Sequence, residues 1–169
     1  MQNTEEATPE RLAKGDVTEV YVQEHKNQPP EKRLRSSGAL YALRRAGTIT
    51  DAHVAAAEHW ARDYETGVLG ARDPEAGKKG GLPDPYVIML SRAAAVRRCE
   101  YVRNALGQVG ETFLHRMMID GMSVQAMAEA ASTHKLRVSG AIDLLLEQLV
   151  EAYQVMPGGL WKVCFEVEF

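Results

Sequence analysis

Apolar residues recur at helical spacing over most of the chain, and this pattern predicts a mainly α-helical protein. One helix is expected over 51–66, with Thr50 as its N-cap and an acidic residue in its first turn. A second, longer helix has an apolar face that runs from Ile88 to Leu106 and is followed by glycines. We therefore expect a helical bundle built around one sizeable core.

Residues 121–146 have the pattern of two short helices joined by a tight turn. Ser123 is placed to cap the first helix, and Ala128 provides the small side chain that two closely crossing helices need. The second helix has an apolar stripe of Val138, Ile142, Leu145 and Leu149. Many proteins enter the major groove of DNA with such a helix-turn-helix, although a helical bundle without a ligand has the same pattern.

Other stretches depart from the helical period and suggest how the chain is divided. The last residues alternate between apolar and polar side chains, which is typical of a half-buried strand, and "PGG" could turn that strand back on "YQVM" as a hairpin. We expect a polar N-terminal arm over 1–30, a helical region over 31–66, a linker over 67–85, a helix-turn-helix domain over 86–156 and a β tail over 157–169.

The charge distribution limits any interaction with nucleic acid to local patches. The formal net charge of −3 is unlike that of proteins that coat polyanions. Residues 121–154 carry two basic and four acidic side chains, a balance of −2. Residues 31–45 have five basic side chains against Glu31, a balance of +4, and residues 92–116 have five arginines against two glutamates, a balance of +3. Phosphate attraction would have to come from these two stretches.

Several other classes of protein are not indicated. Cys99 and Cys164 lie far apart and form no paired motif, and the spacing between His53 and His59 is unlike that of a zinc site on one helix face. The sequence has neither a phosphate-binding glycine loop nor a nucleophile motif, so we expect no enzyme activity, metal or cofactor. No apolar run is long enough to cross a membrane and the start lacks a signal peptide, so we expect a cytoplasmic protein.

The stretch "DGMSVQAMAEAASTHKLRVSGAIDLLLEQL" resembles the region-4 helix-turn-helix of sigma factors, over about a fifth of the chain. Together with "LRRAGTITDAHVAAAEHWARDYE", it is similar to a group of alphaproteobacterial and phage-related regulators that includes an activator of gene-transfer-agent genes. The resemblance implies transcription control through double-stranded DNA, with RNA polymerase as a further partner. Ser132 stands where the family's turn usually has glycine, and Asp143 would lie near phosphates.

Carried over by position, the resemblance implies DNA contacts from His134, Lys135, Arg137 and Ser139 in the second helix and from Ser123 and Gln125 near the backbone. For phosphate attraction outside the motif, the candidates are Arg33, Arg35, Arg44 and Arg45. Two other readings stay open: a phage packaging component of the small-terminase kind, and an adaptor whose exposed Leu136 binds a partner protein. The terminal strand could also join two copies of the chain into a homo-oligomer.

Overall fold

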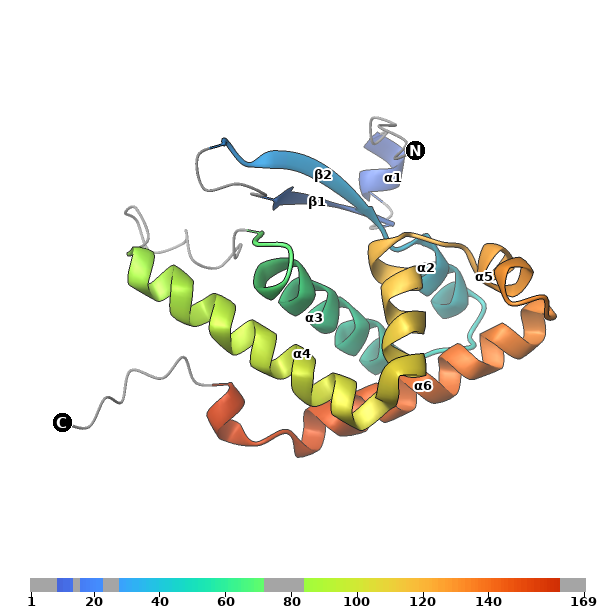
Figure 1. Cartoon of the computed structure of the whole chain (residues 1–169). Helices are drawn as coiled ribbons and strands as arrows, with labels where there is room; N and C mark the ends of the chain where they lie inside the picture. Colours follow the sequence, from blue (N-terminus) through green and yellow to red (C-terminus); the bar gives the residue numbers. More distant parts are fainter. Residues whose placement is uncertain (1–8, 14–15, 23–27, 72–83, 162–169) are drawn as a thin grey trace.

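A computed structural model describes residues 9–13, 16–22, 28–71 and 84–161. This part of the chain is mainly helical and includes a two-stranded antiparallel sheet (Figure 1). The elements are α1 (Pro9–Ala13), β1 (Val17–Val22), β2 (Glu31–Ser36), α2 (Gly38–Arg45), α3 (Asp51–Gly67), α4 (Pro85–Leu114), the π-helix η1 (His115–Ile119), α5 (Val124–Ala130), α6 (Lys135–Val155) and the 3-10 turn η2 (Gly158–Leu160). No helix within these residues is long and apolar enough to cross a membrane.

The predicted helix over 51–66 is confirmed as α3, and its N-terminus is capped as expected. The Thr50 hydroxyl accepts a hydrogen bond from the His53 backbone N–H at 3.4 Å, and the His53 ring accepts one from the Thr50 backbone N–H at 3.3 Å. These reciprocal bonds satisfy two of the donors that a helix start leaves unpaired. α4 begins similarly, with Asp84 as N-cap and Pro85 at the first helical position.

Gly107 ends the first helical part of α4 in a kink, as the sequence pattern predicted. Its φ of 71° is left-handed, and the helix resumes after it and runs to Leu114. Gly121 also has a positive φ, of 66°, and ends the helical run before α5. A Cβ atom at Gly121 would lie 3.2 Å from the Cβ of Ser36, so glycine also allows the close approach of this turn to the end of β2.

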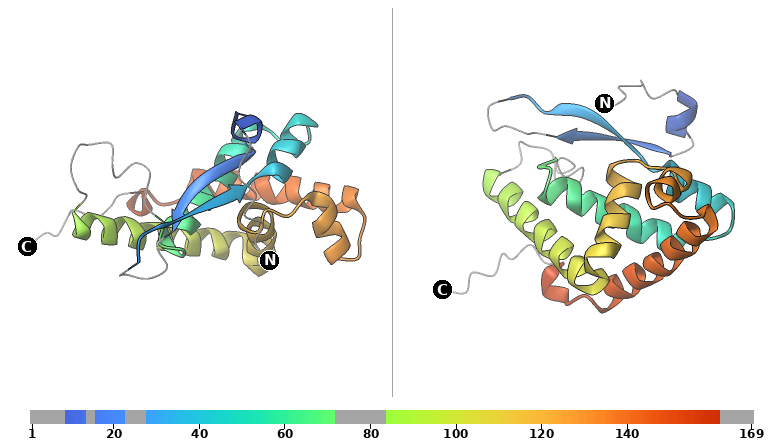
Figure 2. Two further views of the ribbon diagram at one scale, coloured as in Figure 1. Left: turned by 90° about the horizontal axis from the view of Figure 1, so that it is seen from above. Right: turned by 45° about the vertical axis from the view of Figure 1, so that its right-hand side comes forward.

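The helical region expected over 31–66 is only partly correct, because its first residues, 31–36, form a strand. β2 pairs with β1 from Val17 opposite Ser36 to Val22 opposite Glu31. The polar arm over 1–30 therefore contributes a strand to the fold, and the ribbon lies along one side of the helical part (Figures 1 and 2). Backbone pairing with β1 over all six residues makes this stretch a strand, and Arg35 is its one buried side chain.

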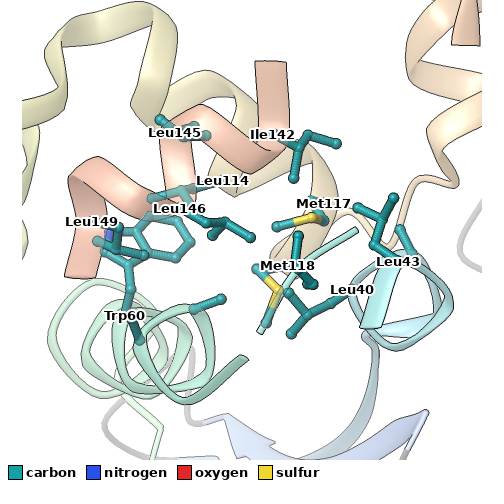
Figure 3. Close-up of a cluster of buried hydrophobic side chains, with 14 of the residues drawn as sticks. Leu40, Leu43, Trp60, Leu114, Met117, Met118, Ile142, Leu145, Leu146 and Leu149 are labelled. Carbon is teal, nitrogen blue, oxygen red and sulfur yellow. The ribbon is translucent and has the colours of Figure 1, made fainter. Parts of the chain in front are cut away.

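One hydrophobic core unites the helices on both sides of the expected linker. Figure 3 shows side chains from α2, α3, α6 and the α4–η1 junction facing one another around Met117 and Met118. Trp60 and Leu146 are both completely buried. Because α3 packs against both α4 and α6, the regions 31–66 and 86–156 form a single packed unit. Residues 72–83, the middle of the linker, lie outside the described residues.

The C-terminal hairpin prediction is wrong in its first strand. The segment "YQVM" is not a strand, because residues up to Val155 belong to α6 and Met156 is buried against the core. The chain then makes the short turn η2, and the Arg98 guanidinium donates to the Leu160 carbonyl at 3.0 Å. Residues 162–169, which hold most of the expected β tail, lie outside the described residues.

Candidate nucleic-acid interface

The helices α5 and α6 are joined by a turn of four residues, 131–134. The Ser123 hydroxyl accepts from the Ala126 backbone N–H at 3.1 Å and caps α5 as predicted. Ser132 has a φ of 49°, the backbone conformation that a glycine adopts most easily. The turn therefore takes a left-handed conformation at the position where the sigma-like pattern usually has glycine.

The inner faces of α5 and α6 are buried where the two helices pack. Met127 and Ala128 of α5 each expose 1% of their surface, and Val138 and Ile142 of α6 expose 2% and 0%. The small Ala128 side chain thus lies in the interior, as the pattern of crossing helices predicted. The pair also packs on the rest of the molecule, because α6 contacts both α3 and α4.

The first turn of α6 projects from the molecule. Lys135, Leu136 and Arg137 are all exposed, and Leu136 is 86% exposed. His134 is the N-cap residue but its side chain makes no capping hydrogen bond, and Ser139 is half-buried. The positive end of a helix dipole and two cations therefore lie at this exposed start of α6, which is favourable for an anion.

The two candidates on α5 have different surroundings. The Ser123 hydroxyl is engaged in the helix cap, which leaves its oxygen directed at the backbone. The Gln125 side chain is exposed and donates to the Glu129 carboxylate at 2.8 Å. Gln125 could exchange this surface bond for a phosphate, whereas Ser123 acts first by fixing the start of α5.

Of the four arginines predicted to attract phosphates from outside the motif, Arg35 lies in the interior, where a DNA phosphate cannot contact it. It is 5% exposed and donates to Glu58 at 2.7 Å and to Ser37 at 2.9 Å, and its Nε atom lies 2.6 Å from Glu65. This buried cluster joins β2 to α3. Arg35 is therefore a structural residue, because a guanidinium surrounded by two carboxylates is already neutralised.

The other three predicted arginines lie nearer the surface, and each has an acidic neighbour. Arg44 makes a two-point contact with Asp51, with one N···O distance of 3.0 Å. Arg45 donates to Asp16 at 3.1 Å, and Arg33 donates to Glu31 at 3.4 Å. The balance of +4 over 31–45 is therefore largely offset by carboxylates that the fold brings in.

The second basic stretch, over 92–116, is also partly neutralised. Arg98 makes a two-point hydrogen bond with the buried Asp63, at 2.6 and 2.9 Å, and Arg103 donates to Glu111 at 2.7 Å. The carboxylate of Glu111 is already included in the balance of +3, whereas Asp63 belongs to another helix. Only the fold shows that Asp63 neutralises the charge of Arg98.

His53 has a structural role that its spacing from His59 did not indicate. It is 3% exposed, and its Nε2 atom lies 3.1 Å from the Glu147 carboxylate of α6. Because Nδ1 accepts from the Thr50 backbone, the hydrogen of a neutral ring would be on Nε2, facing Glu147. The acidic residues of α6 thus anchor the start of α3. Within the described ranges, no cluster of three His, Cys, Asp or Glu side chains could hold a metal ion.

Because of the buried cluster around Arg35, we expect the free energy of unfolding to fall as the pH rises. Burial raises the pKa of the Glu65 carboxyl to about 7, and it outweighs the attraction of Arg35. The native state therefore holds this proton more tightly than the unfolded chain, whose carboxyl titrates near 4.5. The stabilisation is complete below pH 4.5 and is lost as the pH rises through 7, by at most about 3 kcal/mol. We expect Glu65→Gln to remove this dependence.

The measurement is the free energy of urea unfolding of both proteins at several pH values from 5 to 8. Taking the difference between wild type and Glu65→Gln cancels the other titrating groups that the two proteins share. If that difference does not change with pH, the Glu65 carboxyl is ionised throughout the range and the assignment is wrong.

Comparison of the chain with protein-family models, with curated protein sequences and with solved structures finds no match.

Proposed function

We propose that this protein is a DNA-binding regulator in which α5 and the start of α6 act as a helix-turn-helix. The observation that carries the proposal is the exposed first turn of α6, with Lys135 and Arg137 on it, held by a short turn against a fully packed α5. A recognition helix needs this combination, because its N-terminal residues must reach base edges while its other face is rigidly supported.

Each exposed side chain of this turn suits a different part of a duplex. Lys135 and Arg137 can donate to acceptors on guanine in the major groove, and Leu136 can contact a thymine methyl group. Gln125 and the backbone at the start of α5 can lie against a phosphate. The half-buried Ser139 and the N-cap residue His134 lie at the margin of this surface.

The pairing of the surface arginines implies modest affinity. Arg44 and Arg45 can contact phosphates only by exchanging Asp51 and Asp16 for DNA, and such exposed pairs add little stability. Exchange is therefore feasible, but the net gain per phosphate is small. Arg35 makes no such contact, because it is buried.

The test is the effect of Lys135→Ala together with Arg137→Ala on binding to duplexes that the wild type selects from a random library. We expect preference for the selected duplex over a scrambled one to fall by about 1–3 kcal/mol per lost base contact. Fluorescence anisotropy at several salt concentrations measures it. Arg44→Ala with Arg45→Ala should instead weaken binding to both duplexes and flatten its salt dependence.

Arg62→Ala is the matched control, because Arg62 is exposed on α3, outside the helix-turn-helix and outside both basic stretches. It should bind both duplexes as the wild type does. If the library yields no preferred sequence and the wild type shows no salt-dependent binding to any duplex, the protein does not bind DNA in this way.

A protein-binding role is the second candidate, because α6 exposes large apolar side chains that include two leucines. Leu136 is 86% and Leu144 is 66% exposed, two helical turns apart. Leu144→Asp separates the two proposals, since it lies beyond the first turn of α6. A variant that loses a protein partner and keeps DNA binding would favour the adaptor role.

A further inference from the structure

The surface between α3 and the α4–η1 junction has a pocket of about 290 Å³, at the small end of the range for ligand sites. Its wall includes the π-helix η1, which supplies His115 and Arg116. π-helical turns are rare and often occur at functional sites. The pocket is polar and lies outside the proposed DNA interface.

The π-helix determines which side chains of the pocket are paired. In an α-helix, Asp120 would lie one turn from Arg116 and could neutralise it. Here the wider turn brings Asp120 to His115. The Asp120 backbone N–H donates to the His115 carbonyl at 3.0 Å, and the Asp120 carboxylate lies 3.2 Å from the His115 ring. The π-helical turn therefore keeps this carboxylate engaged with His115.

The remaining acidic side chain of the pocket is also occupied. Glu111 accepts a hydrogen bond from Arg103 at 2.7 Å. Arg116 is half-buried and, among the residues that the structure describes, has no carboxylate partner. A guanidinium has five donors, and without a counter-charge it is an incomplete ion pair. Its complement is a planar or tetrahedral oxyanion.

A tyrosine side chain of the pocket also suits such a group. The Tyr64 ring packs edge to face with His115, with ring centroids 5.3 Å apart, which orients both rings at the wall. Burial raises the pKa of the Tyr64 phenol, so its hydroxyl stays protonated and can donate a hydrogen bond. Thr112 donates to the Gln108 carbonyl at 2.8 Å and so fixes its side chain at the rim.

We propose that this pocket binds the carboxylate or phosphate group of a small molecule, with Arg116 as the residue that pairs with it. The acidic side chains Glu111 and Asp120 are already engaged with Arg103 and His115, and Tyr64 supplies a hydroxyl donor. The volume admits a compact metabolite and excludes a folded partner. The proposal does not depend on DNA binding, because the pocket is complete within the single chain.

The experiment follows the amide and arginine Nε–H signals of the full chain by NMR while inorganic phosphate or acetate is added. Sodium chloride at the same ionic strength serves as the reference. We expect phosphate or acetate to shift the Arg116 Nε–H signal and the amides of η1 with a saturable curve, in the millimolar range for so small a probe. Whichever of phosphate and acetate saturates the shifts at the lower concentration is the anionic group that the pocket prefers.

Arg116→Gln should abolish the saturable shifts. Arg116→Lys should weaken the affinity for the anion at least tenfold, because lysine cannot make the two-point contact. Arg97→Gln is the matched control and should bind as the wild type does. Circular dichroism confirms that each variant is folded. Shifts that persist in Arg116→Gln, or that sodium chloride reproduces, would overturn the proposal.

Discussion

Replacing Ile142 by Asp should unfold the protein or lower its free energy of unfolding by about 4 kcal/mol or more. Ile142 is completely buried where α6 meets α5 and the Met117–Met118 region (Figure 3). A carboxylate there would lose its hydration without gaining a partner, and the lost side chain would leave a gap in the core. Urea denaturation followed by circular dichroism measures the loss.

Leu144→Asp provides the matched control on the same helix. Leu144 is 66% exposed, so an acidic side chain at this position stays hydrated. The control should change the free energy of unfolding by no more than about 0.5 kcal/mol. Equal effects of the two substitutions would mean that α6 does not pack on the core through its Val138, Ile142 and Leu149 face.

The parts of the fold that were predictable depend on signals close together in the sequence. The caps at Thr50 and Ser123 each involve neighbours within a few residues, and both are found as expected. The apolar stripe of α6 was predictable for the same reason, because its period is a property of one helix. The use of the helix pair for DNA binding stays a prediction.

The errors have a common physical cause, which is a partner distant in sequence. The stretch 31–36 is basic and has few apolar residues, so its local pattern did not reveal a strand until β1 was known to pair with it. Arg35 looked like a surface cation because Glu58 and Glu65 belong to another helix. The anion pocket depends on a π-helical turn, for which the sequence around Arg116 carries no recognised signal.

The second large effect is expected from Arg35→Met. The substitution keeps much of the side-chain length but leaves the two carboxylates of Glu58 and Glu65 beside each other, and Glu65 is almost fully buried. Breaking a buried ion pair by removing one partner costs about 3–5 kcal/mol. The loss should be largest at pH 8, because a protonated Glu65 tolerates its burial better. Urea denaturation at pH 5 and pH 8 measures both values.

Two further variants separate charge from packing. Arg45→Met removes an arginine whose pair with Asp16 is exposed, so it should cost no more than about 1 kcal/mol. Adding Glu65→Leu to Arg35→Met replaces the deepest part of the cluster by apolar groups and should recover a large share of the lost stability, because the buried carboxylate is then absent. If the double variant is no more stable than Arg35→Met at pH 8, the loss comes from the detachment of β2 from α3 and the unpaired charge contributes little.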